Sequence, residues 1–189
     1  IKTNSMKDTK KFMKLMDKLS RKYDVHNVFS DFISISICCL SQQQMEDYYF
    51  EIIKKYDKDE LPIFSGMFAE MVIGMENKYD FLGHIYMEIR SKSKGSSFGQ
   101  FFTPEHVCDL MTQCVKLETK YYEKVNDPCC GSGRLLISYA KFCKPYELAT
   151  TRFVGADLDH LCVKMTMINC CLNGLLGEFY HMNTLSYEI

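Results

Sequence analysis

The chain has 189 residues, of which 47% are hydrophobic and 25% are charged, a globular balance that excludes a disordered tail, a collagen and a coiled-coil rod. The 23 Lys and Arg residues against 24 Asp and Glu residues give a net charge of -1, so any contact with nucleic acid would need a local basic patch, a further part of the protein or a partner. No apolar run approaches the roughly 18 residues of a membrane helix, and no signal peptide is visible. We therefore expect a cytoplasmic protein that makes no membrane contact.

The cysteines are numerous but show no metal-binding pattern. Ten are present, three pairs of them adjacent, yet no C-x-x-C occurs and the histidine spacing matches no zinc site. We expect free thiols that pack as small hydrophobic residues, with neither a metal site nor disulfides.

Residues 1–90 are expected to form a helical N-terminal domain. Apolar residues recur at intervals of three and four, which predicts helices over residues 12–19, 28–40, 45–53, 62–72 and 79–89. These apolar and aromatic faces are typical of a packed core rather than of a cofactor site.

The second domain is expected to comprise residues 91–189. A polar loop over residues 91–97 leads into Phe98–Pro104 (FGQFFTP), where Thr103 is a candidate N-cap and Pro104 a candidate first residue of a helix. An apolar face then predicts a helix as far as residue 115.

The rest of this domain alternates between strand and helix. Strands are predicted over residues 122–126, 152–156 and 178–182, with helices over 133–142 and 162–169 between them. Asn173 and Gly174 end the second helix. A β-α-β-α-β order favours an α/β fold with a parallel sheet.

Three candidate ligand-binding positions fall at the ends of the predicted strands. The loop Asp127–Arg134 joins a strand to a helix, Asp157 closes the second strand, and Asn183 closes the third. Ligands of such sheets lie outside the carboxyl ends of the strands, where an acidic residue accepts hydrogen bonds from ribose hydroxyls and an Asn meets an adenine edge. Taken singly, Asp157 could also be an N-cap, Asn183 the start of a turn, and the Gly-x-Gly a simple turn. Together the three positions predict a nucleoside-cofactor pocket.

The glycine pattern narrows the choice of cofactor. The loop is not G-x-x-x-x-G-K-[ST], which excludes a P-loop, and Gly131 and Gly133 are not followed by the third glycine of a dinucleotide site. S-adenosylmethionine fits better, because it carries no pyrophosphate.

With these motifs in order, the sequence resembles the N6-adenine DNA methyltransferases, and among them the modification subunit of type I restriction systems. That family shows G-Q-[FY]-[FY]-T-P, then D-P-x-C-G-[ST]-G, then an acidic strand end, then [DN]-[ST]-L. Here these are Gly99–Pro104, Asp127–Gly133, Asp157 and Asn183–Leu185. The resemblance implies a Rossmann-like class I methyltransferase fold, here incomplete, that follows a helical N-terminal domain.

The resemblance also implies a set of residues that bind S-adenosylmethionine. Its methionine end would be bordered by Gln100, Phe101, Phe102, Thr103, Pro104 and Glu105. Its amino-acid and sugar portions would be held by Asp127, Cys130, Gly131, Ser132, Gly133 and Arg134. Asp157 would bind the ribose hydroxyls, Asn183 would bind the adenine, and apolar walls would be formed by Leu158 and Leu185. Its implied partners are DNA and the other subunits of a restriction system.

One departure from the family pattern leaves catalysis open. The family's catalytic [DNS]-P-P-[YFW] motif is absent, since the four prolines are Pro62, Pro104, Pro128 and Pro145. Without it, the target adenine would be neither stacked nor oriented, so no catalytic residue is assigned. Three hypotheses remain: the cofactor half of a longer DNA methyltransferase, an inactive regulatory module that binds S-adenosylmethionine, and a vestigial pocket. Arg90, Lys92 and Lys94 are the best local candidates for DNA contact, although a solvated flexible loop is the favoured interpretation of this cluster.

Overall fold

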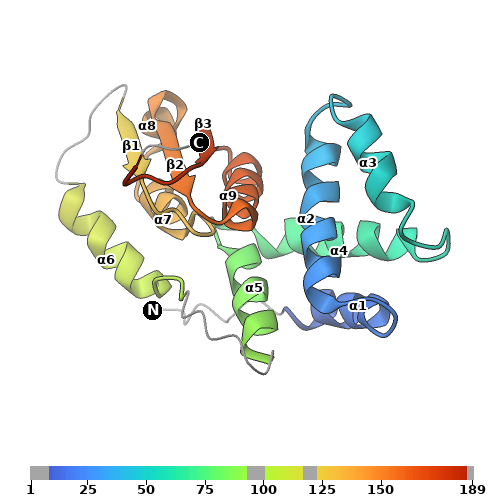
Figure 1. Ribbon diagram of the computed structural model, residues 1–189. Helices are drawn as coiled ribbons and strands as arrows, with labels where there is room; N and C mark the ends of the chain where they lie inside the picture. Colours follow the sequence, from blue (N-terminus) through green and yellow to red (C-terminus); the bar gives the residue numbers. More distant parts are fainter. Residues whose placement is uncertain (1–8, 93–100, 117–122, 187–189) are drawn as a thin grey trace. The chain divides into compact units, whose positions relative to one another are not determined.

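The computed structural model describes residues 9–92, 101–116 and 123–186 (Figure 1). By its internal contacts the chain divides into two compact units, Ile1–Gly74 and Met75–Ile189. Gln100 and Lys94, both named above as candidates, lie outside the described residues.

The first unit is helical. Its elements are α1 (Lys10–Ser20), α2 (Val25–Leu40), α3 (Glu46–Ile53) and α4 (Leu61–Gly74). α1 packs against α2 and α4, and α2 packs against α3. The apolar faces that predicted these helices form the core, in which Phe12, Met16, Phe32 and Met67 are almost fully buried. Asp24 caps α2, because its carboxylate accepts hydrogen bonds from the backbone N–H groups of His26 and Asn27.

The second unit combines helices with a parallel sheet. Its elements are α5 (Phe81–Lys92), α6 (Glu105–Val115), β1 (Lys124–Asp127), α7 (Arg134–Lys141), α8 (Pro145–Thr150), β2 (Arg152–Asp157), α9 (His160–Leu172) and β3 (Gly177–His181). The strands pair in the order β1-β2-β3 and all run parallel. The predicted α/β alternation and parallel sheet are therefore confirmed.

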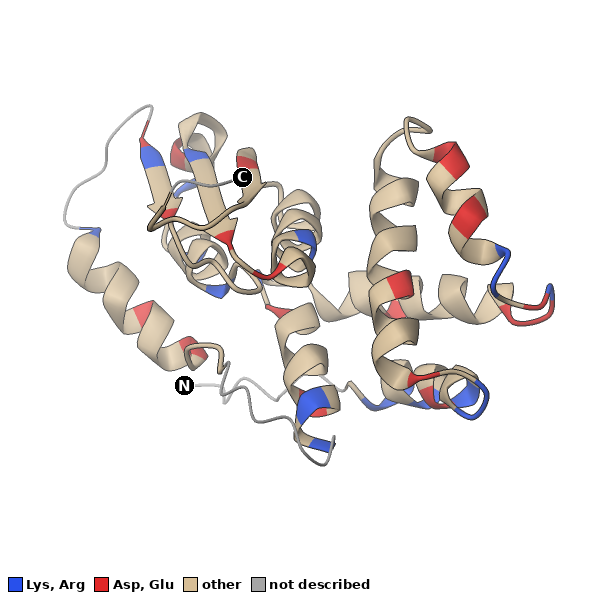
Figure 2. Cartoon of the chain, viewed as in Figure 1, with Lys and Arg blue, Asp and Glu red and all other residues tan. Residues whose placement is uncertain are grey.

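A hydrophobic core joins this sheet to the helices beside it. α9 packs on β2 and β3, and α7 packs on β1, α6 and α9 (Figure 1). The core cluster consists of Leu136, Tyr139, Ala140, Phe153, Cys170 and Leu175. Because parallel strands end at the same edge of a sheet, this arrangement places Asp127 and Asp157 at one edge (Figure 2).

Four details of the predicted elements need correction. α8 was not predicted. α6 begins at Glu105 with Pro104 as its N-cap, so Thr103 lies one residue outside the cap. Ser91 and Lys92, expected in a loop, are the last residues of α5. α5 itself, expected in the helical domain, belongs to the unit that contains the sheet.

The structure also bears on membranes, metals and thiols. Within the described residues, no helix has both the length and the apolar character that crossing a membrane requires. The same residues contain no group of three or more His, Cys, Asp and Glu side chains placed to hold a metal ion. The cysteines are free thiols, with Cys38, Cys108, Cys130, Cys162 and Cys170 buried.

Candidate functional site

A pocket of about 430 Å³ lies at the carboxyl ends of β2 and β3. Its lining residues are Phe101, Phe102, Pro128, Cys129, Gly131, Asp157, Leu158, Met182, Asn183, Thr184 and Leu185. Pockets of roughly 300–1,000 Å³ bind small molecules. The sequence-predicted residues that the fold gathers here are Phe101, Phe102, Gly131, Asp157, Leu158, Asn183 and Leu185.

Asp157 is the last residue of β2. Its Oδ2 accepts a hydrogen bond from the Gly131 N–H at 2.9 Å, and its Oδ1 accepts one from the Asp159 N–H at 2.8 Å. The N-cap of α9 is Asp159, whose Oδ1 accepts from the Leu161 N–H, so Asp157 is not the capping residue. Each oxygen of an ionised carboxylate has two acceptor positions, so Asp157 can still accept from a diol.

The loop between β1 and α7 passes close beside Asp157. The Cys130 N–H donates to the Ala156 carbonyl at 2.9 Å, which fixes the loop to β2. Gly131 and Gly133 have φ values of 55° and 82°, which favour glycine. A Cβ atom at Gly131 would lie 3.0 Å from the Phe102 ring, so glycine is also needed for this close approach.

Phe102 contacts both this loop and helix α5. Its ring stacks on Tyr86 of α5, with centroids 5.3 Å apart, and the Arg134 guanidinium lies 5.8 Å from the ring centroid. The Arg134 Nη1 donates to the Thr103 carbonyl at 3.0 Å. Phe101, by contrast, is 81% exposed at the pocket. Phe101 and Phe102 therefore form one part of the wall, with Phe102 fixed and Phe101 open to a ligand.

The turn after β3 supplies a further part of the pocket wall. The Asn183 Oδ1 accepts from the Leu185 and Ser186 N–H groups at 3.0 and 3.4 Å, so this side chain does start a turn. Its Nδ2 is the group that can donate to a ligand. Leu158 and Leu185, which also line the pocket, are 71% and 93% exposed, so two apolar side chains are open to a ligand there.

Two buried groups near the loop have shifted pKa values. Burial raises the pKa of Asp127 above its ordinary value, the Cys129 N–H at 3.1 Å opposes that shift, and the nearby Asp157 carboxylate adds to it. Burial also raises the pKa of the Cys130 thiol to about 12. A thiol with so high a pKa is a poor nucleophile, so Cys130 acts in packing.

Other predicted residues lie outside the pocket lining. Asp127 lines a separate hollow between β1, α6 and α7. Ser132 and Gly133 are buried, and Arg134 is bonded to Asp80 and Thr103. Thr103, Pro104 and Glu105 are not among the lining residues. The lining residues Pro128, Cys129 and Thr184 lie within the predicted motifs but were given no role of their own, and Met182 was missed. The sequence analysis also gave no role to Asp80, whose carboxylate contacts Ser132 and Arg134.

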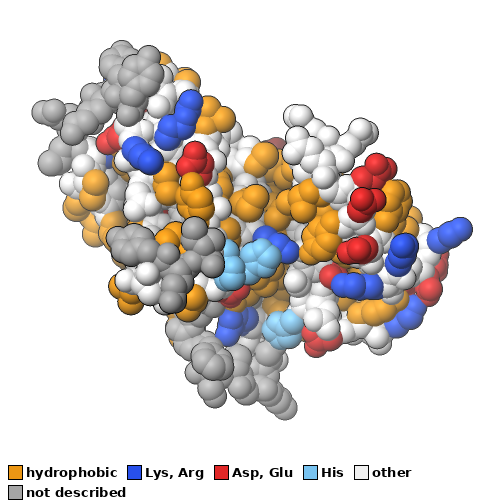
Figure 3. Space-filling view, turned by 45° about the horizontal axis from the view of Figure 1, so that its top comes forward, with side chains coloured by type: hydrophobic (Ala, Val, Ile, Leu, Met, Phe, Trp, Pro, Cys, Tyr) orange, Lys and Arg blue, Asp and Glu red, His pale blue; other side chains and the backbone are white. Residues whose placement is uncertain are grey.

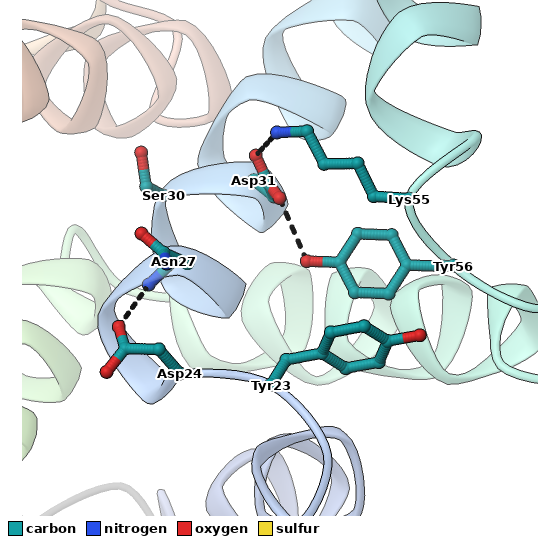
Figure 4. A pocket seen from close by; sticks show the side chains of 7 residues that line it. All are labelled: Tyr23, Asp24, Asn27, Ser30, Asp31, Lys55 and Tyr56. Carbon is teal, nitrogen blue, oxygen red and sulfur yellow. Dashed lines mark hydrogen bonds and ion pairs between the residues drawn. The ribbon is translucent and has the colours of Figure 1, made fainter.

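A second hollow, of about 500 Å³, lies in the helical unit (Figure 4). Asp31 in its wall accepts hydrogen bonds from Lys55 Nζ and the Tyr56 hydroxyl, both at 2.9 Å. Asp24, beside it, is the cap of α2. Because these carboxylates already serve the fold, the hollow is a weaker candidate site than the pocket at the strand ends.

The charged residues of the described part of the chain are mixed in sign within each unit (Figure 2). Lys92 pairs with Glu88 at 2.8 Å, and the Arg90 guanidinium lies 5.3 Å from the Tyr86 ring centroid. On the face shown in Figure 3, acidic and basic side chains are interspersed with hydrophobic ones. This pattern agrees with the near-zero net charge.

Two solved structures resemble the fold. One is assigned as a class I S-adenosylmethionine-dependent methyltransferase from Listeria monocytogenes, with a TM-score of 0.58 and 14% identity over 94% of this chain and 54% of that one. The other is the methyltransferase subunit of a type I restriction-modification system from Streptococcus thermophilus, with a TM-score of 0.51 and 20% identity over 92% of this chain and 39% of that one. The expected class I methyltransferase fold is thus confirmed.

Sequence comparisons give the same family. The methylase subunit of the type I restriction enzyme MpnII of Mycoplasma pneumoniae is 24% identical over 73% of this chain, and that of EcoEI of Escherichia coli is 26% identical over 65%. The chain spans 24% and 28% of the lengths of these two relatives. Residues 77–188, more than half of the chain, match the family N-6 DNA Methylase. The chain therefore belongs to the N-6 DNA methylase family, as its motifs indicated.

Proposed function

We propose that this chain binds S-adenosylmethionine and forms the cofactor-binding part of an N6-adenine DNA methyltransferase of a restriction-modification system. The observation that carries the proposal is the pocket at the ends of β2 and β3, where Asp157, the glycine loop and two exposed leucines meet. DNA and the other subunits of such a system are the proposed partners. They follow from the family and from the relatives named above.

The pocket residues suit the chemical groups of this cofactor. The Asp157 carboxylate has acceptor positions for both ribose hydroxyls, while Leu158 and Leu185 provide apolar surface for the adenine. Asn183 Nδ2 would donate to a ring nitrogen. The N–H groups at the start of α7 and the Phe101–Pro104 segment would border the amino-acid end, because a helix start favours a carboxylate.

Bound S-adenosylmethionine would supply an electrophilic methyl group. This chain's residues would hold the cofactor and exclude water from it, with the exposed Phe101 as one candidate cover. The [DNS]-P-P-[YFW] motif is absent from the 189 residues, so we propose that another part of the protein or a partner receives and orients the target adenine.

The absent motif also supports a second candidate, a regulatory module that binds S-adenosylmethionine without methylating DNA. The two candidates differ in whether methyl groups are transferred to DNA. If the purified chain transfers labelled methyl groups to adenine in DNA, the regulatory module is excluded. If transfer appears only after a chain carrying the missing motif is added, the methyltransferase proposal is supported.

Calorimetric titration with S-adenosylmethionine tests the pocket itself. We expect saturable binding by the wild-type chain and binding about 10- to 100-fold weaker in Asp157→Ala, because hydrogen bonds to a charged group contribute about 1.5–3 kcal/mol. Asp24→Ala is the matched control, since Asp24 also accepts two backbone N–H groups but lies in the other unit. Its affinity should equal that of the wild type. No binding by a folded wild-type chain, or equal weakening in both variants, would contradict the proposal.

A further inference from the structure

A buried carboxylate, on the residue directly before α5 in the sequence, contacts the loop of the proposed cofactor site. Asp80 is 1% exposed, and its two oxygens accept four hydrogen bonds. Oδ1 accepts from the Gly83 N–H and from Asn169 Nδ2, both at 2.8 Å. Oδ2 accepts from Ser132 Oγ at 2.6 Å and from Arg134 Nε at 2.8 Å.

These bonds join segments that are far apart in the sequence. Gly83 belongs to α5, Ser132 and Arg134 to the loop and start of α7, and Asn169 to α9. The Asn169 Nδ2 also donates to the Ser132 carbonyl at 2.7 Å, so the loop is held through its side chain and its backbone. Asp80 is therefore the point at which the loop is fastened to two helices.

Arg134 extends this connection to the FFTP segment. While its Nε is bonded to Asp80, its Nη1 donates to the Thr103 carbonyl at 3.0 Å and its guanidinium lies 5.8 Å from the Phe102 ring centroid. The planar guanidinium carries several donors in a fixed geometry, so the bond to Asp80 also sets the direction of the bond to Thr103.

The number of bonds indicates what Asp80 does. An ionised carboxylate has about four acceptor positions, and four donors occupy those of Asp80, so it has none left for a ligand. A buried charge is tolerated only when it is paired and hydrogen-bonded, which favours this one arrangement of the loop over others. Asp80 acts on a ligand through Ser132, Arg134 and Thr103, not by touching it.

We infer that Asp80 is a positioning residue that holds the glycine loop and the Phe101–Pro104 segment ready for the amino-acid end of the cofactor. This inference rests on the proposed cofactor site. The ribose acceptor Asp157 and the adenine-facing Asn183 come from the ends of β2 and β3, which make no hydrogen bond to Asp80 among those described. Loss of Asp80 should therefore affect the two ends of the cofactor unequally.

Two probes that share a nucleoside test this inference. S-Adenosylhomocysteine carries the amino-acid end, and adenosine lacks it. In Asp80→Asn, the amide that replaces Oδ2 turns a donor toward Arg134, so the loop is no longer pre-organised. We expect the Kd for S-adenosylhomocysteine to rise about 10- to 100-fold, the equivalent of one lost hydrogen bond to a charged group, while the Kd for adenosine is unchanged.

The control is the same substitution at another ion-paired carboxylate. Asp31→Asn removes the partner of Lys55 and Tyr56 in the helical unit (Figure 4), and it should leave both Kd values as in the wild type. Arg134→Lys is the second variant, used if Asp80→Asn does not fold. It keeps the charge beside Asp80 but cannot bond Asp80 and Thr103 in the same fixed geometry, so the same selective loss is expected.

Each outcome of these titrations either supports or overturns the inference about Asp80. A selective rise in the Kd for S-adenosylhomocysteine supports the inference. Equal weakening of both probes in a folded variant, or no change in either, overturns it while the cofactor proposal stands. If the folded wild-type chain binds neither probe, the proposed function fails, and the inference fails with it.

Discussion

A Gly83→Ala variant is expected to lose about 3–5 kcal/mol of the free energy of unfolding, the range found when a buried ion pair is broken. An added Cβ would lie 2.1 Å from Asp80 Oδ2 and 2.5 Å from Ser132 Oγ. No rotation of the alanine relieves this contact, because Cβ is fixed by the backbone. Asp80 must therefore move away from Arg134 and Ser132, which leaves its charge buried with fewer donors.

Gly66→Ala is the matched control for this prediction. In α4, the added Cβ would meet, among the described residues, the end of the Leu15 side chain, at 3.2 and 3.9 Å. Such an end can rotate, and alanine is favoured over glycine inside a helix by about 1 kcal/mol, so the stability should stay equal or rise slightly. Because the chain has two units, amide hydrogen exchange followed by mass spectrometry is the suitable measurement. Equal protection of α5 and α7 in the two variants would show that the Asp80 network adapts.

The fold could be predicted where the sequence carried a regular pattern. α9 is an example, because its apolar face continues to Leu172, and Asn173 with Gly174, whose φ is 71°, then ends the helix. α8 was missed because it has six residues, too few to show a period, and its N-cap is Lys144, a residue type that does not signal a helix start. Glu147 stabilises that start instead, accepting a hydrogen bond from the Lys144 N–H.

The start of α6 illustrates a smaller error. Thr103 was predicted as the cap because threonine favours that position, but Pro104 has φ -57° and ψ 143°, so the helical backbone begins one residue later. A residue before proline is disfavoured in helical geometry, which keeps Thr103 extended. Its carbonyl is then open to Arg134, an outcome that the cap preference alone could not indicate.

The candidate pocket could be predicted in part for a geometric reason. Parallel strands bring their carboxyl ends together, so Asp157, Asn183 and Gly131 could be assigned to one pocket from their order alone. Asp80 could not be found in this way, since it precedes the loop by about fifty residues and belongs to no local motif. Ser132 and Arg134, assigned to the cofactor from their motif, are directed to Asp80. Sequence motifs marked the loop, but the contacts that support it depend on tertiary structure.

The largest effect expected away from the pocket is that of Lys116→Met. Lys116 Nζ lies 2.7 Å from Glu147 Oε2, with side chains only 11% and 4% exposed, and 3.1 Å from Cys143 Sγ. Removing the ammonium group leaves a buried carboxylate without its cationic partner, which should destabilise the chain by about 3–5 kcal/mol. The double variant with Glu147→Gln should recover most of that loss, because no uncompensated charge then remains. Amide hydrogen exchange of the second unit, followed by mass spectrometry, measures both differences.

Lys92→Met is the control for burial, since Lys92 pairs with Glu88 at 2.8 Å on an exposed part of α5. Such an exposed pair contributes about 0.3–0.5 kcal/mol to the free energy of unfolding.

The pH dependence of stability gives an independent check on the role of Lys116. Burial lowers its pKa, but hydrogen bonds to Glu147 and Cys143 raise it by more, so the net pKa lies above its ordinary value. The stabilisation is therefore fully present below about pH 10.4, the pKa of an unfolded lysine, and declines as the pH rises through the raised pKa. A loss of the difference in stability between wild type and Lys116→Met already at pH 8 would show that the ion pair of Lys116 with Glu147 is not its source.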